Sequence, residues 1–303
     1  MKRLGVVGSM VWDTIYEREP AQPAVEEWGG ISYSLAALDA SLAGDWEIVP
    51  LIKVGRDLAP RANAFLHSLH HVPPEARFLE VAEPNNRVTL RYADAERRCE
   101  QMSGGVPPWT WPELGPLIAD LDAVYVNFIS GYEMDLATAR FLRRGFSRFL
   151  YADLHSLFLD RTGDGTRVPR ELPDAPAWFG CFDMVQLNED EMGQLGNDPL
   201  GVAAGALAQG CRTLVVTLGS RGAAYFTGTP VRTARIPADN PRVDAGDPTG
   251  CGDVFGASVV AALLGGASLE DAIRLGNRMG ARNVTYRGAT GLRDHLLGRL
   301  TTV

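Results

Sequence analysis

The sequence predicts an α/β fold with a doubly wound, mostly parallel sheet and a small β-sheet lid. Short apolar runs, each long enough for one strand, recur at residues 123–126, 149–152, 184–187 and 213–216. Roughly 20 to 30 residues with some helical patterning, such as 135–144, separate successive runs. This alternation is typical of βαβ units, whose right-handed crossovers place helices on both faces of a parallel sheet.

Two segments interrupt this alternation. Residues from about 11 to 29 and from 86 to 102 mix polar and β-favouring residues, and residues 88–92 alternate as a half-exposed strand does. We expect both segments to form a small separate sheet that covers the site. The glycines and prolines of residues 104–108 then mark the return to the main body. Residues 1–303 are therefore predicted to form a single domain that carries its own lid.

Composition narrows the class of protein. The 303 residues carry a net charge of -8, which argues against nucleic acid as a partner because such binding depends on clustered Lys and Arg. The four cysteines form no C-x-x-C pair, so neither a zinc site nor a disulfide framework is indicated. Asp13 ends the first apolar run, and the run at 259–264 is too short to cross a bilayer. We therefore expect a cytoplasmic protein without a membrane partner.

The most informative stretch is residues 247–256, with the sequence DPTGCGDVFG. It leads from a turn into a helix of small residues, where Gly250 and Gly252 expose backbone N–H groups to an anion. Asp253 adds a carboxylate to this anion pocket, and its natural task there is to accept the proton of an attacking alcohol. Alternatively, Asp247 or Asp253 simply caps the helix, as aspartate often does. The residues alone leave both interpretations open.

Residues 247–253 resemble the C-terminal signature D-T-x-G-A-G-D of the ribokinase/PfkB family of sugar kinases. They differ from it at Pro248 and Cys251 but keep both glycines and the final aspartate. The resemblance implies that Asp253 is the catalytic base and that the amides of Gly250, Cys251, Gly252 and Asp253 form an anion hole. Cys251 is then a small helix residue rather than a nucleophile, because no activating base is visible beside it.

Two further matches concern metal ions. Residues 188–191 follow a predicted strand and are similar to the N-x-x-E motif of the family. This resemblance implies that Asn188 and Glu191 help to order Mg²⁺ and the phosphates. Glu191 would contact the Mg²⁺ ion through retained water. Locally, a helix that begins with an Asn cap is an equally good interpretation. Asp247 and Ala289 lie where several relatives bind a monovalent cation. The resemblance therefore implies a candidate K⁺ site at these two residues.

The nucleotide end resembles the family in two places. A predicted strand ends at Thr217 and continues into a glycine turn through Gly219 and Gly222. Asn277 lies on a predicted helix that opens with a capping signal at residues 268–271. In the family both places meet the nucleotide, so the resemblance implies ATP as the phosphoryl donor.

The first part of the chain resembles the region of the family that binds the phosphoryl acceptor. Asp13 matches an aspartate that usually binds substrate hydroxyls, which suits a carboxylate that can accept two such bonds. Gly29 and Gly30 match a glycine pair where the absence of side chains lets a sugar ring approach the backbone. Ser34 stands where relatives commonly carry Asn. Asp153 ends a predicted strand, where it could reach the substrate or a phosphate.

The histidines allow more than one interpretation. His155 follows Asp153 where many relatives carry Asn, and it is either a ligand of substrate or phosphate or a hydrogen-bonded structural residue. The spacing of His67, His70 and His71 would group imidazoles on one helix face, so a transition metal must be considered. No carboxylate or cysteine lies close to this cluster in sequence. We therefore favour a structural role for it.

Taken together, the ordered motifs predict an ATP-dependent phosphotransferase that acts on a hydroxyl of a sugar, polyol or nucleoside. The acceptor class stays open because Trp12, Trp28 and Tyr33 could stack on a base or on a sugar face. One alternative is a catalytically idle relative that binds a sugar or nucleotide for regulation, although Asp253 argues against it. Another is a nucleotide-binding partner protein, and the lid edge offers a surface for a homodimer.

Overall fold

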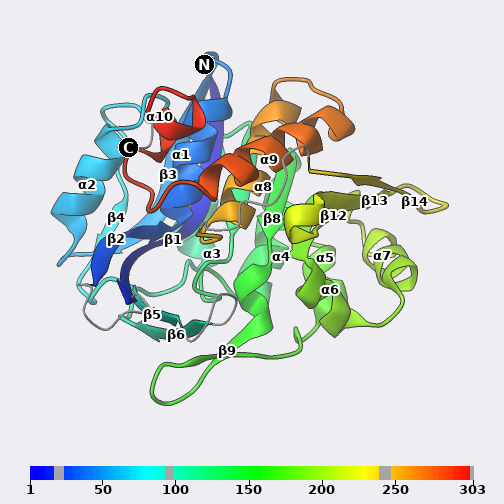
Figure 1. Cartoon of the computed structure of the whole chain (residues 1–303), viewed down its shortest axis with the longest axis horizontal. Helices are drawn as coiled ribbons and strands as arrows, with labels where there is room; N and C mark the ends of the chain where they lie inside the picture. Colours follow the sequence, from blue (N-terminus) through cyan, green and yellow to red (C-terminus); the bar gives the residue numbers. More distant parts are fainter. Residues whose placement is uncertain (17–23, 93–97, 239–246, 301–303) are drawn as a thin grey trace.

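The computed structural model describes residues 1–16, 24–92, 98–238 and 247–300 (Figure 1). Its main sheet has the order β14-β13-β12-β11-β8-β7-β1-β3-β4. The strands are β1 (Lys2–Tyr16), β3 (Trp46–Gly55), β4 (Leu79–Val81), β7 (Ala123–Asn127), β8 (Phe149–Asp153), β11 (Met184–Asn188), β12 (Thr213–Thr217), β13 (Ala223–Thr227) and β14 (Arg232–Ile236). Only the β12–β13 and β13–β14 pairs in this order are antiparallel. The predicted fold class is therefore confirmed.

Two layers of helices cover the sheet. One layer consists of α1 (Ile31–Ser41), α2 (Ala59–His67), α8 (Cys251–Leu264), α9 (Leu269–Asn283) and α10 (Leu292–Leu296), and Figure 1 shows most of it in front of the sheet. The other consists of α3 (Trp111–Leu114), α4 (Leu136–Gly145), α5 (Ala175–Phe179), α6 (Glu189–Leu195) and α7 (Pro199–Ala208). The central strands are buried on both faces, which explains their continuous apolar runs. Within the described part of the chain, no helix has the length and apolarity needed to cross a membrane.

The sheet has a switch point at β1, because β3 pairs with one of its edges and β7 with the other. In open α/β sheets, ligands bind at such points, in the crevice beyond the carboxyl ends of the strands. Helix α8 points its N-terminus into this region and packs against α1 and α9. Residues 254–261 of α8 are all buried, as expected for a helix that is apolar on every side.

The second sheet shares the long strand β1 with the main sheet. Beyond the main sheet, β1 pairs with β2 (Val25–Gly30) and β5 (Arg87–Tyr92), and β5 pairs with β6 (Arg98–Ser103). A small apolar cluster that includes Val11, Val88 and Met102 lies inside it. Residues 17–23 and 93–97 of the two segments expected to form a lid lie outside the described residues. The role of this sheet as a lid stays a prediction.

A short hairpin, which the sequence analysis did not predict, packs against the second sheet. It consists of β9 (Leu159–Arg161) and β10 (Arg167–Pro169), and it follows the short 3₁₀ helix η2 (His155–Phe158). Gln101 and Thr166 form a bridge, and the Met102 N–H donates to the carbonyl of Gly165 at 2.8 Å. The hairpin therefore covers part of the strand edge through which a homodimer was expected to form.

Candidate functional site

Several of the predicted acceptor and phosphate residues line one cavity of about 100 Å³, namely Asp13, Gly30, Gly250 and Asp253. It lies between the second sheet, the carboxyl ends of β7 and β8, and the N-terminus of α8. Its polar lining includes Asp13, Tyr33, His155, Arg167 and Asp253. Segments that are far apart in sequence thus supply one small site. Asp13 and Asp253, from the two ends of the chain, both face it.

The Asp253 carboxylate lies in the first turn of α8. The N-cap of this helix is Gly250, so capping by an aspartate side chain does not explain Asp253. Instead, the Asn127 Nδ2 donates a hydrogen bond of 2.7 Å to Asp253 Oδ1, and it also approaches Ser34 Oγ at 3.2 Å. Asn127 was missed in the sequence analysis. Its position at the end of a predicted strand, on the crevice side of the sheet, was the available signal.

Gly250 lets the turn before α8 pass closely over Tyr33. Its φ of 76° favours glycine, and a Cβ at this position would lie 2.4 Å from the Tyr33 ring. Burial raises the pKa of the Tyr33 phenol, and the charges of Asp13, Asp247 and Asp253 raise it further. Tyr33 is therefore a neutral hydroxyl between three carboxylates, able to donate one hydrogen bond.

Other parts of the protein occupy the space that side chains at Gly29 and Gly30 would fill. A Cβ at Gly29 would lie 1.9 Å from Asp13 Oδ2, and one at Gly30 would lie 2.6 Å from the Ser9 carbonyl oxygen. Asp13 is only 6% exposed. Gly29 thus lets Asp13 occupy its position at the cavity, and Gly30 lets the chain pass close to the Ser9 carbonyl. Their predicted contact with a sugar ring stays a prediction.

Two further predicted residues are buried behind the cavity. Ser34 is fully buried, and its hydroxyl lies 3.1 Å from Tyr125 Oη. It supports Asn127, and its predicted contact with substrate stays a prediction. Burial raises the pKa of the Cys251 thiol to about 11, in keeping with a small helix residue rather than a nucleophile. The Cys251 N–H donates to the Pro248 carbonyl at 3.2 Å, so one amide of the predicted anion hole has an internal partner.

A buried polar network extends from Asp153 to Glu191. Gln186 Nε2 donates to Asp153 Oδ2 at 2.7 Å, while burial and the charges of Glu191 and Asp253 raise the pKa of Asp153 to about 8. His155 Nδ1 lies 2.5 Å from Glu191 Oε1. The His155 side chain is 47% exposed, so the loss of solvent that would lower its pKa is only partial, and the hydrogen bond and charge of Glu191 raise the pKa to about 9. At neutral pH, His155 and Glu191 therefore form an ion pair.

Asn188 and Glu191 form a capping box at the start of α6. The Asn188 side chain accepts from the Glu191 N–H at 2.9 Å, and Glu191 Oε2 accepts from the Asn188 N–H at 2.8 Å. The local interpretation as an Asn-capped helix is thus correct. It does not exclude the predicted role, because Glu191 also faces His155.

Across the described ranges, no three His, Cys, Asp or Glu side chains are arranged to hold a metal ion, and this includes the histidine cluster. His67 Nε2 lies 3.3 Å from the Pro74 carbonyl oxygen, and His71 Nδ1 lies 3.0 Å from Asp39 Oδ1. His67 and His71 therefore have partners within the chain.

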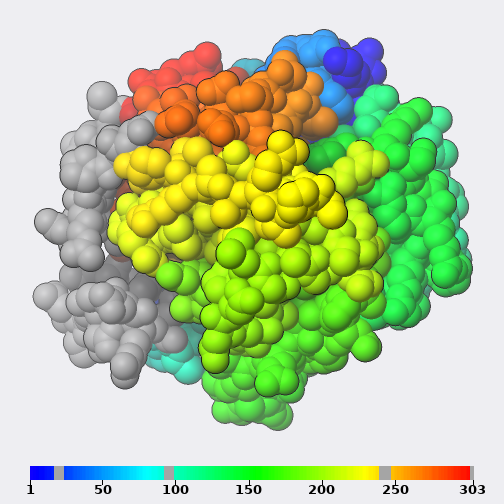
Figure 2. Space-filling view, turned by 90° about the vertical axis from the view of Figure 1, so that its right-hand side faces the viewer, coloured from blue at the N-terminus to red at the C-terminus, as the bar shows by residue number. Residues whose placement is uncertain are grey.

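At the far end of the sheet, the predicted nucleotide residues gather beside β14. Gly222, with a φ of 94°, passes so close to the Ile236 carbonyl that a Cβ would lie 2.1 Å from it. Asn277 Nδ2 donates to the same carbonyl at 3.1 Å. Figure 2 shows α9, in orange, above the yellow strands β13 and β14. Thr217 ends β12, and Gly219 begins the short turn between β12 and β13.

The residues of the candidate K⁺ site lie on two neighbouring loops. Asp247 Oδ1 accepts from the Thr249 N–H at 2.9 Å, and Arg287 Nε lies 3.7 Å from Asp247 Oδ2. Ala289 is buried, and its N–H donates to the Trp28 carbonyl at 3.3 Å. Arg287 thus already places a positive charge beside the carboxylate of Asp247.

Comparison with known proteins agrees with this arrangement. A model of the pfkB family of carbohydrate kinases matches residues 158–295. Ribokinase from Arabidopsis thaliana is 30% identical over 142 residues, which cover 44% of this chain and 35% of that protein. The second half of the chain is thus similar to the pfkB family of carbohydrate kinases. The aligned segment spans about a third of the length of this curated relative.

Solved structures share the fold of this chain along its whole length. The structure of Arabidopsis thaliana ribokinase with ribose and ATP has a TM-score of 0.74 at 19% identity and covers 100% of both chains. A sulfate complex of a pyrophosphate-dependent kinase in the ribokinase family has a TM-score of 0.77 at 19% identity, covering 99% of this chain and 100% of that chain. At such identities the likeness shows the fold alone.

Proposed function

We propose that this chain transfers the γ-phosphoryl group of Mg·ATP to a hydroxyl of a sugar, polyol or nucleoside. The observation that carries this proposal is the Asp253 carboxylate at the N-terminus of α8, oriented by Asn127 at 2.7 Å and facing the same cavity as Asp13. The similarity of residues 158–295 to the pfkB family supports transfer to a sugar-like acceptor. The likeness to both an ATP-bound and a pyrophosphate-dependent kinase makes the donor the part to be tested.

In the proposed reaction, Asp13 and Tyr33 hold the acceptor. Asp13 accepts hydrogen bonds from substrate hydroxyls, and the neutral Tyr33 phenol donates one. Asp253 then takes the proton of the attacking hydroxyl as the oxygen approaches the γ-phosphorus in line with the leaving group. The positive end of the α8 dipole favours the negative charge of the phosphoryl oxygens. The second sheet would exclude water, which could otherwise accept the phosphoryl group.

The surroundings of Asp153 fit a divalent cation that is held indirectly. Burial, together with the nearby charges of Glu191 and Asp253, raises the pKa of Asp153 to about 8, so a cation bound here would favour its ionised form. Glu191 is 3% exposed and is engaged by Asn188 and His155. We therefore assign it a contact to Mg²⁺ through water, with the donor phosphates as the direct ligands. Bound Mg²⁺ would neutralise the charge on the transferred phosphoryl group.

The remaining parts of the proposal follow the resemblance. Thr217, Gly219, Gly222 and Asn277 would contact the nucleotide, and Asp247 with Ala289 would form the K⁺ site. The four cysteines are free thiols, which supports a reducing, cytoplasmic setting. Closure of the lid segments 11–29 and 86–102 over the acceptor would accompany each turnover.

The test is an assay of donor consumption with Mg·ATP or Mg·pyrophosphate against a panel of sugars, polyols and nucleosides. Asp253→Asn should lower kcat by about two to four orders of magnitude, since it removes a general base. Asp190→Asn is the matched control, because Asp190 also lies in a first helical turn but is exposed on α6. Pyrophosphate use would refute only the ATP part. Binding of ATP without turnover of any acceptor would instead favour an idle regulatory protein.

A further inference from the structure

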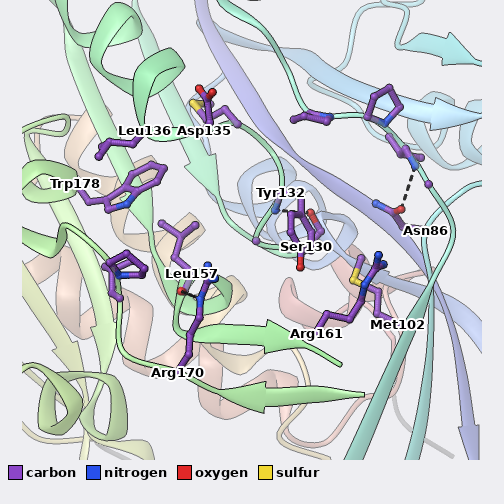
Figure 3. A pocket seen from close by; sticks show the side chains of 18 of the residues that line it. Asn86, Met102, Ser130, Tyr132, Asp135, Leu136, Leu157, Arg161, Arg170 and Trp178 are labelled. Atoms are coloured by element: carbon purple, nitrogen blue, oxygen red, sulfur yellow. Dashed lines mark hydrogen bonds between the residues drawn. The ribbon is translucent and has the colours of Figure 1, made fainter. Parts of the chain in front are cut away.

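A second and larger cavity, of about 520 Å³, lies next to the candidate active site (Figure 3). Three segments form most of its wall: the return segment 104–108, the loop 130–136 that follows β7, and residues 157–178 around the β9–β10 hairpin. Asn86 and Met102 complete it. Its volume falls in the range of about 300–1,000 Å³ that is typical of small-molecule sites. Apart from Asn86 and Met102 at the two ends of lid segment 86–102, no residue with a role in the proposed phosphoryl transfer lines it, so the reaction does not account for it.

The floor of this cavity is apolar. It is formed by Met134, Leu157, Leu172 and Trp178, all less than 9% exposed. The Trp178 indole is held by an edge-on contact with Phe128, at 5.3 Å between ring centroids. A rigid aromatic ring beside branched aliphatic side chains offers a surface for a flat apolar group.

Two arginines provide the charge. Arg161, in β9, lies over the Tyr132 ring at 5.7 Å, and Arg170, just after β10, uses its Nε to bond the Leu157 carbonyl at 3.1 Å. Neither guanidinium forms an ion pair with any carboxylate in the described ranges of the chain. The terminal nitrogens of Arg170 thus remain available to a ligand.

The two aspartates on the cavity wall do not cancel this charge. Asp135 caps α4, and its Oδ1 accepts from the Thr138 N–H at 2.7 Å. Asp174 is exposed on the rim, where solvent screens its charge. The cavity therefore combines an apolar floor with two guanidinium groups that suit a carboxylate, phosphate or sulfonate.

We propose that this cavity binds a small molecule with a flat apolar body and one anionic group. The apolar body lies against Trp178 and Leu157, and the anionic group bonds Arg161 and Arg170. This function goes beyond the proposed phosphoryl transfer. Since the acceptor and nucleotide residues line other surfaces, the occupant is an effector rather than a substrate.

The walls of the cavity also reach the candidate active site. The Glu133 carboxylate accepts from the N–H groups of Ile129 and Ser130 at 3.0 and 2.7 Å and from the Ser9 hydroxyl at 2.8 Å, so the loop after β7 is firmly held. Ile129 lines the active-site cavity and Ser130 lines the second one. Met102, which also lines the second cavity, belongs to β6. Binding here should therefore change the apparent affinity for the acceptor, and the reverse must hold by linkage.

The first test uses 8-anilinonaphthalene-1-sulfonate, a flat aromatic anion whose fluorescence rises in apolar surroundings. We expect saturable binding to the full chain and a loss of affinity of about tenfold or more in the double variant Arg161→Gln/Arg170→Gln. The matched control is Arg140→Gln/Arg144→Gln, which removes the same charge from exposed positions on α4. Basal turnover should be unchanged in both double variants. Equal affinity in the two double variants would overturn the proposal.

Two further measurements separate the parts of the proposal. The uncharged probe N-phenyl-1-naphthylamine should bind at least tenfold more weakly than the sulfonate, and equal affinities would refute an anion site. Leu172→Trp, which narrows the apolar floor but keeps both arginines, should weaken sulfonate binding. Saturating acceptor should change the affinity for the sulfonate to a finite plateau. Displacement that grows without limit would place the probe in the active site and refute a second site.

Discussion

Replacing Asn127 with leucine would remove the hydrogen bond that orients the proposed base. Asn127 ends β7, its side chain is fully buried, and its Nδ2 lies 2.7 Å from Asp253 Oδ1. Leucine has a similar branched shape but no donor. Asp253 would keep its place on α8 and lose the partner that fixes its carboxylate.

The expected size of the effect follows from the negative charge of Asp253, which accepts the hydrogen bond. A hydrogen bond to a charged group contributes about 1.5–3 kcal/mol. Since about 1.4 kcal/mol corresponds to tenfold in rate, kcat should fall by about 10- to 150-fold if the bond acts in the transition state. The acid limb of the pH profile of kcat should also move to higher pH, because an ionised carboxylate loses a stabilising donor. The KM of the acceptor should change little, since Asp13 faces the acceptor.

The assay is steady-state turnover with a saturating donor, combined with thermal unfolding to show that each variant is folded. Ser258→Ala serves as the control. Ser258 is a fully buried polar residue on α8, the helix that carries Asp253, and its hydroxyl accepts a hydrogen bond of 3.5 Å from the Ser41 hydroxyl. It should retain kcat within about threefold, as expected for a weak bond away from the reaction. A folded Asn127→Leu protein with an unchanged kcat and pH profile would refute the orienting role.

Three other outcomes follow from the site. Gly250→Ala should lower the unfolding temperature and kcat more than Gly266→Ala. Both glycines have a positive φ, but only at Gly250 would a Cβ meet an aromatic ring, at 2.4 Å from Tyr33. Equal losses in the two variants would contradict the close approach of Gly250 to Tyr33. The pKa of His155 is raised to about 9, so the stability it contributes is complete below about pH 6.5 and disappears as the pH rises through 9. The difference in unfolding temperature between the wild type and His155→Gln should thus shrink between pH 6 and pH 10, whereas a constant difference would refute this ion pair. Turnover should fall when tetramethylammonium replaces K⁺, and unchanged rates would remove Asp247 and Ala289 as a cation site.

The sequence was most informative where an element and its chemistry are local. The apolar runs predicted the four central strands because strands buried on both faces have no polar side to interrupt them. Residues 247–256 likewise predicted a turn and a helix N-terminus, because the glycines and the acidic residue act within a few positions of one another. Their geometry, with Gly250 as the N-cap of α8, is as local as the motif.

Contacts across long distances were beyond the sequence. The hydrogen bond from Asn127 to Asp253 joins residues 126 positions apart. No local pattern around either residue indicates the other as its partner. The hairpin of β9 and β10 has strands of only three residues, too short for a periodic pattern. Gly29 was interpreted through its freedom to approach a ligand, whereas the structure shows the Asp13 carboxylate in the space that a side chain would fill.

The charges of the site bear on whether the chain is an enzyme or an idle relative. Asp13, Asp247 and Asp253 surround Tyr33, while Asp153 and Glu191 lie beside His155. Gathering carboxylates in a buried site is unfavourable, and the pKa of Asp153 near 8 corresponds to several kcal/mol of unfavourable interaction for its ionised form. Amides of the same shape would bind sugar hydroxyls without this cost. A chain that only binds a ligand therefore has no need of the carboxylates, whereas a chain that binds Mg²⁺ and removes a proton needs both the negative charge and the base.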